Sequence, residues 1–304
     1  MNQLPGAHRP PLWAYLCLVA SMALVGCYVG LSKLLVAALP VFLLAWLRFG
    51  IAALAMLHWV KRRDGDAALS PHDRQLLFWE SFLGNFMFSI CMLFGVQATS
   101  ALAAGVVMAA IPAAVAILSR AFLGERIVPR VQAAIVCAAV GIALLALAKA
   151  PANAASAAQA PWWGYALLLG AVVCEACYVV IGKRLTGNVS PRRISALINL
   201  WGLALVTPFG LWQAWSFDFS AVRVDIWALL VFYAVAASMV TVWLWMQGLR
   251  EVPAPQAGVF SVMLPVAAAL VGVGVLGEHF TPGHAAAFAL ALASLLLATW
   301  PARR

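Results

Sequence analysis

The chain has 304 residues, of which 65% are hydrophobic and only 10% are charged. Soluble domains carry about a quarter charged residues, so this composition excludes an ordinary soluble protein and indicates a membrane protein. The net charge of +9 does not indicate a nucleic-acid partner, because the basic residues do not lie on a solvated face beside other polar residues. Disordered, collagen-like and disulfide-rich proteins are excluded by the same composition.

Ten apolar stretches are long enough to cross a membrane as helices, which takes about 20 residues each. They lack the polar–apolar alternation of barrel strands, so the predicted fold class is an all-α membrane protein with ten transmembrane helices. In chain order the stretches cover about Trp13–Val36, Val41–Val60, Gln75–Val96, Ser100–Ser119, Val131–Ala148, Trp162–Gly182, Ile194–Trp212, Ile226–Met246, Gln256–Leu276 and Gly283–Trp300.

The distribution of basic residues predicts the orientation of these helices. Ten spans place both chain termini on one side, and assigning that side to the cytoplasm puts 15 of the 19 basic residues in its loops. Cytoplasmic loops of membrane proteins carry an excess of lysine and arginine. We therefore expect both termini in the cytoplasm and a multi-pass protein of the inner (plasma) membrane.

The two halves of the chain repeat one another. Five residues of the first half recur 153 positions later without a gap, namely Gly105, Pro112, Gly124, Glu125 and Pro129 as Gly258, Pro265, Gly277, Glu278 and Pro282. The expected domains are therefore two five-helix repeats, residues 1–149 and 161–304. Because five is odd, the second repeat would be inverted in the membrane relative to the first, as in many secondary transporters.

The ten-span plan, the two P-(x)11-G-E segments that begin at Pro112 and Pro265, and the P-(x)7-R segment from Pro40 to Arg48 resemble the drug/metabolite transporter (DMT) superfamily in its EamA-like branch. This resemblance covers nearly the whole chain. It implies secondary transport of small metabolites, often export of amino acids or other compounds, including drugs, from a central cavity. It also implies that the fifth and tenth helices are peripheral.

Two charged residues are expected deep within the spans. Glu175 lies about 13 residues into the sixth span, where an ionised carboxylate costs several kcal/mol unless it faces a cavity, is paired or takes up a proton. It is therefore a candidate proton-binding group, and the alternative is a protonated structural carboxyl hydrogen-bonded between helices. Arg48 could pair with Glu175, bind a substrate carboxylate through its planar guanidinium, or extend to the outer interface.

Polar and aromatic residues within the spans are further candidates for a substrate or proton site. Tyr28 and Tyr178 occupy matching positions of the repeat, and Tyr178 shares a helical face with Glu175. The others are Asn85, Asn199 and Trp243. The alternative for each is a hydrogen bond that only joins two helices.

Prolines and glutamates of the repeated segments have expected structural roles. Pro112 and Pro265 are predicted to kink the middle of their helices. Glu125 and Glu278 each follow a glycine that ends a helix, and each is predicted to cap the start of the next helix along the chain.

No nucleophile–base pair, metal-ligand cluster or cofactor motif is visible, so we expect no enzyme activity, no catalytic residues, no metal and no cofactor. The expected partners are a small-molecule substrate, the lipid bilayer and protons, with a homodimer as an open alternative and no nucleic acid. The predicted function is an alternating-access exporter. Its alternatives are a structural or assembly subunit of the membrane and a channel without coupled transport.

Overall fold

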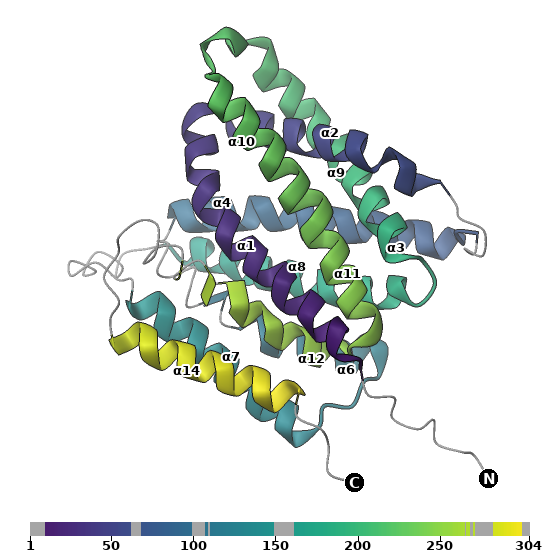
Figure 1. Ribbon diagram of the computed structural model, residues 1–304, viewed down its shortest axis with the longest axis vertical. Helices are drawn as coiled ribbons and strands as arrows, with labels where there is room; N and C mark the ends of the chain where they lie inside the picture. The colour runs from purple at the N-terminus through teal and green to yellow at the C-terminus, as the bar shows by residue number, and fades with distance from the viewer. Residues whose placement is uncertain are drawn as a thin grey trace.

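The structure is a computed structural model, and it describes residues 10–61, 68–98, 107–108, 110–148, 161–264, 266–267, 270 and 282–299. These residues form helices joined by short connections, with no strand among them (Figure 1). The helices of the first half are α1 (Leu12–Ala38), α2 (Val41–Val60), α3 (Pro71–Ser81), η1 (Phe82–Met87), α4 (Phe88–Ala98), α6 (Ile111–Leu123) and α7 (Pro129–Ala148).

The second half follows a similar order of elements, with the short 3-10 segments η3 and η5 in addition. Its helices are α8 (Trp162–Thr186), α9 (Pro191–Trp215), η3 (Phe219–Ala221), α10 (Val224–Ala234), η4 (Val235–Val240), α11 (Thr241–Glu251), α12 (Ala254–Val259), η5 (Phe260–Val262) and α14 (Pro282–Thr299). The helical fold class is confirmed for the described part of the chain.

Among the described residues, four helical segments are long and apolar enough to cross a membrane. They are α2, α8, α9 and the continuous segment Val224–Glu251. Shorter apolar helices cover Leu12–Cys27, Ile111–Leu123, Pro129–Leu144 and Ala285–Thr299. The count of ten spans and the side of the termini stay predictions.

Local sequence signals explain where several helices begin and end. Ser70 and Asp73 form a capping box at the start of α3, with Pro71 at the first helical position; each side chain satisfies a backbone N–H that the helix leaves unpaired. Helix α6 ends at Gly124, whose φ of 67° is left-handed, a conformation that glycine adopts without steric cost.

Two π-helical segments lie at matching places in the two halves. The continuous helix α3–η1–α4 begins at Pro71, and its counterpart α10–η4–α11 begins 153 residues later at Val224. All three parts of the two helices coincide at this offset, including η1 and η4. A π-segment inserts an extra residue into a turn and occurs often at functional sites.

Helices that correspond in the two halves pack against each other. Extensive contacts join α2 to α9 and α7 to α14, and the contact of α1 with α11 is matched by the contact of α8 with α4. Figure 1 shows α7 and α14 side by side at the lower edge of the molecule. Their contact surface is a separate apolar cluster that includes Ala134, Ala138, Ala287 and Ala291, and these small residues allow the two helices to approach closely.

Glu125 caps a helix of the other half, so the expectation that it caps the next helix along the chain is wrong. Its Oε2 atom accepts hydrogen bonds from Ser119 Oγ at 2.5 Å and from the backbone N–H of Ala254, the first residue of α12, at 3.0 Å. A carboxylate at a helix N-terminus satisfies an unpaired N–H and interacts favourably with the helix dipole. Glu125 therefore joins the end of α6 to the start of α12.

Pro112 lies in the first turn of α6 rather than in the middle of a helix, because α6 begins at Ile111. A proline there costs little, since its missing N–H would have no intrahelical partner. Helical residues 107–108 and a turn at Ala110 precede α6, so the predicted kink at Pro112 stays a prediction. Pro265 and Glu278 lie outside the described residues.

The ends of several helices, two of which carry basic residues, meet at one end of the molecule. Lys183 Nζ donates to the carbonyls of Leu249 and Arg250 at 2.8 and 3.1 Å, and Asn188 donates to Asp73 at 3.4 Å. These contacts bring together the ends of α8 and α11 and the start of α3. We call this region, defined by these five residues, the basic end.

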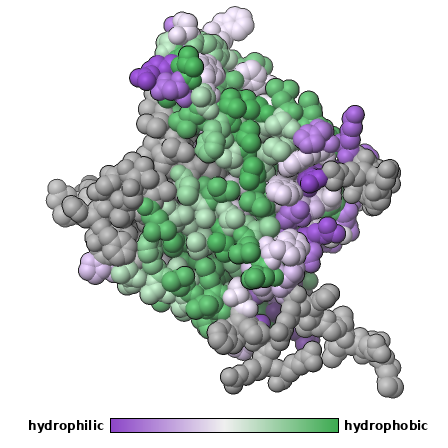
Figure 2. Space-filling model, viewed as in Figure 1, coloured by the Kyte–Doolittle hydropathy of each residue, from purple (hydrophilic) through white to green (hydrophobic). Residues whose placement is uncertain are grey.

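The opposite end of the bundle is formed by the start of α2 and by the connection between α9 and α10. There, Gln213 accepts a hydrogen bond from the N–H of Leu43, and Arg223 forms a 3.0 Å ion pair with Asp225. Figure 2 shows an apolar surface over the middle of the molecule, with hydrophilic residues gathered at the upper tip and along the right edge. This distribution suits a protein whose middle is covered by lipid.

Gly248 allows α11 to lie against α1. A Cβ atom at Gly248 would come within 2.6 Å of Leu18 Cγ and 2.7 Å of the Ala14 carbonyl oxygen, whereas a Cβ at Gly50 would meet only Leu203 at 4.0 Å. We expect Gly248→Ala to destabilise the protein by about 1–3 kcal/mol, because overpacking forces backbone shifts. Thermal unfolding in detergent should show a lower midpoint for Gly248→Ala than for the parent, and no decrease for Gly50→Ala. Equal midpoints for Gly248→Ala and the parent would contradict the close packing.

Candidate functional site

A cavity of about 470 Å³ lies inside the bundle, within the range of about 300–1,000 Å³ typical of small-molecule sites. Residues from both halves line it, and most of them are apolar. The lining residues are Ser21, Met22, Val25, Arg48, Phe49, Asn85, Phe88, Met92, Met108, Ile111, Ile142, Glu175, Tyr178, Ile198, Asn199, Ala237, Ser238, Thr241, Val242, Trp245, Ser261 and Leu264. Ile142 belongs to α7, so one of the two helices expected to be peripheral also reaches the cavity.

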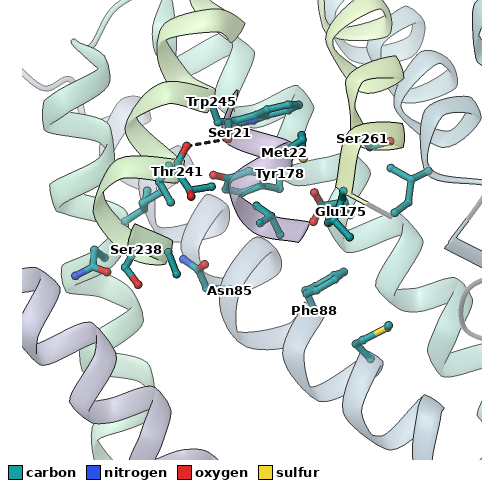
Figure 3. Close-up of a pocket in the computed structure, with 18 of the residues that line it drawn as sticks. Ser21, Met22, Asn85, Phe88, Glu175, Tyr178, Ser238, Thr241, Trp245 and Ser261 are labelled. Carbon is teal, nitrogen blue, oxygen red and sulfur yellow. Dashed lines mark hydrogen bonds between the residues drawn. The ribbon is translucent and has the colours of Figure 1, made fainter. Parts of the chain in front are cut away.

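Hydrogen bonds from side chains to backbone carbonyls join the helices around the cavity. Ser21 Oγ of α1 donates to the Thr241 carbonyl at 2.9 Å, as Figure 3 shows. Asn199 Nδ2 of α9 donates to the Phe49 carbonyl of α2 at 3.0 Å, and Asn199 is only 2% exposed. Both bonds satisfy buried polar groups and fix neighbouring helices relative to one another.

The two π-segments supply corresponding polar groups to the cavity. Asn85 lies in η1, and Ser238 lies 153 residues later in η4. Both line the cavity and are labelled in Figure 3. In each half, the departure from regular α-helix thus coincides with a cavity-facing polar residue.

Glu175 lies in the cavity wall in the middle of α8 (Figure 3). The Glu175 carboxyl forms no ion pair with another described residue. An unpaired carboxylate in apolar surroundings is costly. The position of Glu175 therefore suits a group that binds a proton or interacts with a molecule in the cavity.

Arg48 also lines the cavity, but it forms no ion pair with Glu175 in the described structure. Its guanidinium lies over the Phe49 ring at 4.5 Å from the centroid and 5.9 Å from that of Tyr233. Its Nε is buried and has no hydrogen-bond acceptor among the described residues. Aromatic faces stabilise the cation and leave N–H groups able to bind an anionic group.

The remaining predicted site residues fall into three groups. Asn85, Asn199 and Tyr178 line the cavity together with Glu175 and Arg48. Trp243 is absent from the lining; it lies near Trp59, and the Arg192 guanidinium is 6.0 Å from its ring. The Tyr28 side chain lies outside the described part of the structure.

Glu80 is a buried acidic residue that the sequence analysis missed. It is 0% exposed, and neither carboxyl oxygen has a hydrogen-bond partner among the described residues. The expectation that only Glu175 and Arg48 lie deep within the helices is therefore wrong. The signal was present in the sequence, because Glu80 falls inside the predicted span Gln75–Val96.

A bundle of apolar helices around a cavity with one acidic and one basic side chain defines an integral membrane protein with a small-molecule site. The profile of the EamA-like transporter family matches this chain twice, over residues 12–147 and 162–300. The chain therefore belongs to the EamA-like transporter family, within the DMT superfamily, and it is a multi-pass membrane transporter.

Curated relatives carry the same general description. The uncharacterized transporter YetK of Bacillus subtilis (strain 168) is 34% identical over 277 residues, which cover 91% of this chain and 83% of YetK. The uncharacterized transporter YyaM of the same organism is 23% identical and covers 76% of this chain and 75% of its own length. A protein of known crystal structure is 20% identical with a TM-score of 0.73, covering 94% of this chain and 96% of that one, which shows a shared fold.

The Asn199 bond provides a test of the cavity wall. We expect Asn199→Ala to lower the free energy of unfolding by about 1 kcal/mol, because the buried Phe49 carbonyl loses its donor. Ser89→Ala is the matched control, since Ser89 is exposed and bonds to the Asn85 carbonyl in its own helix. Denaturation of both variants in the same detergent should separate them. A stable Asn199→Ala protein would show that this bond does not hold α9 to α2.

Proposed function

We propose that this protein is a secondary transporter that exports small metabolites by alternating access and is coupled to protons through Glu175. The observation that carries the proposal is the cavity of about 470 Å³, which holds Glu175 and Arg48 inside an apolar bundle. A charged group in such a place is costly to bury, so it marks a substrate or ion pathway.

The correspondence of the two halves supports alternating access. We propose that residues 1–149 and 161–304 are inverted repeats, each of five helices. The matching of η1 with η4, and the packing of α2 on α9 and of α7 on α14, suit two units related by a pseudo-two-fold axis. Two such units can exchange conformations of similar energy, one open to each side of the membrane.

The cavity residues suggest a division of roles. Arg48 offers N–H groups to an anionic group of the substrate, and Asn85 and Ser238 offer uncharged hydrogen-bonding groups. The apolar majority of the lining, including Met22, Phe88 and Trp245, would contact the remainder of the substrate. Glu175 would exchange its proton with each side of the membrane in turn.

Replacement of Glu175 tests the coupling. A substrate would first be identified by screening metabolites released from cells that overproduce the protein, and then be loaded into liposomes that contain purified protein. We expect Glu175→Gln to abolish the acceleration of transport by an imposed pH gradient, because the amide cannot exchange a proton.

Glu175→Asp is the matched control, since it keeps a titratable group and should retain part of the gradient response. Arg48→Lys would test the substrate site separately and should raise the KM for an anionic substrate without removing the response to the gradient. If Glu175→Gln transports the substrate as fast as the parent and responds equally to the gradient, coupling through Glu175 is excluded.

We further propose that the basic end faces the cytoplasm of an inner (plasma) membrane, in accord with the positive-inside rule. Labelling of one added cysteine in each of two variants tests this orientation. Ser220→Cys in the α9–α10 connection should react with an impermeant maleimide in intact cells, whereas Gly187→Cys at the basic end should react only after permeabilisation.

The parent chain controls for its six native cysteines, all of which are free thiols within helices. The reverse labelling pattern would place the basic end outside. A homodimer stays a prediction, and the elution volume of the labelled proteins in detergent, measured with light scattering, would test it.

A further inference from the structure

Glu80 is buried at the junction of α3, α8 and α11, on the side of the cavity that leads to the basic end. Its Oε1 atom lies against Gly182 of α8, where an added Cβ would be 2.8 Å from that oxygen, 3.1 Å from Leu249 Cδ2 and 3.2 Å from Met246 Cε. Gly182 follows Glu175 by seven residues, or about 10 Å along the helix. Glu80 therefore lies beyond the cavity, toward Lys183 and Arg184.

No cation compensates Glu80 in the described structure. Its electrostatic neighbours are Glu175, Cys177 and the backbone of Gly182, all on α8. Lys183 is adjacent to Gly182, but its ammonium group donates to the α11 carbonyls of Leu249 and Arg250. Helix α11 also places the side chains of Met246 and Leu249 against Gly182, and neither of these side chains titrates.

Helix α9 also packs against α3. A hydrogen bond joins the two helices next to Glu80, where Ser81 donates to the Ile198 carbonyl at 2.8 Å. Buried apolar residues that belong to one cluster of the core, including Leu77, Val179 and Met246, lie at this junction. The carboxyl of Glu80 is thus enclosed by apolar side chains, by the backbone of Gly182 and by one other acid.

These surroundings accept a neutral carboxylic acid and exclude a carboxylate. In these apolar surroundings, which offer no cation among the described residues, an ionised Glu80 would cost several kcal/mol, and the nearby Glu175 would add repulsion when it is ionised. Ionisation therefore requires α3, α8 and α11 to separate and admit water. By linkage, a proton that binds the closed form more tightly than the open form stabilises the closed form.

We propose that Glu80 is a second proton-binding carboxyl, and that its protonated form keeps the junction of α3, α8 and α11 closed between the cavity and the basic end. On opening, the carboxylic acid releases its proton to water that enters from the basic end and becomes a carboxylate; on closing, the carboxylate takes a proton back. The protonation of Glu80 and the closure of the junction do not depend on the proposed function. Only the use of this proton in transport rests on it.

Infrared spectroscopy of the full chain in lipid nanodiscs tests the protonation without a substrate. At neutral pH, the Glu175→Gln variant should retain the carbonyl stretching band of a protonated carboxylic acid, because Glu80 remains. The double variant Glu80→Gln, Glu175→Gln should lose this band. If Glu175→Gln alone shows no such band, Glu80 is ionised and the proposal fails, whether or not Glu80→Gln folds.

Glu80→Asp, combined with Glu175→Gln, provides a second assignment of the band. The shorter acid should keep the protonated carbonyl band but move its frequency, whereas an unmoved band would come from another residue. These spectra are independent of the transport assay. A transport response that survives Glu175→Gln would overturn the proposed coupling through Glu175 and leave the protonation of Glu80 intact.

Hydrogen–deuterium exchange tests the closure of the junction. In the parent, exchange at residues 177–186 should rise with pH by more than the intrinsic chemical rate, because deprotonation of Glu80 opens the helices. In Glu80→Gln, which stays neutral, only the intrinsic rise should remain. The same pH dependence in both proteins would show that Glu80 does not control the junction.

Discussion

Polar groups inside an apolar bundle have to find partners within the protein, and the arrangement of the helices depends on this requirement. Helices satisfy their own backbone groups, but side chains within them need a donor or an acceptor elsewhere. Ser21, Ser81 and Asn199 each donate to a backbone carbonyl of a different helix. These three bonds join α1 to α11, α3 to α9 and α9 to α2 around the cavity, so the same requirement fixes the geometry of the site.

The charged side chains follow this requirement in different ways. Arg48 lies over aromatic rings, Lys183 donates to the carbonyl end of α11, and Glu125 accepts the first N–H of α12. Glu175 and Glu80 have no such compensation from the described residues. The contrast separates charges that stabilise one arrangement of helices from the two acids to which we assign a role in proton binding.

Much of the fold was predictable from the sequence. The predicted span Val41–Val60 coincides with α2, because Pro40 precedes a long uninterrupted apolar run. The π-segments were not predictable, since the extra residue in each turn depends on packing against other helices. Trp243 illustrates the same limit for the site: it lies between the lining residues Val242 and Trp245 in the sequence, but helix rotation turns it toward Trp59 and Arg192.

Although the two π-segments have matching backbones, they present different chemical groups to the cavity. Asn85 carries an amide with two donor hydrogens and an acceptor oxygen, whereas Ser238 carries one hydroxyl. A molecule in the cavity therefore meets unlike chemical groups at η1 and at η4. In the alternating-access cycle that we propose, the opening would change from one side of the membrane to the other, but the bound molecule would keep a single orientation relative to the protein.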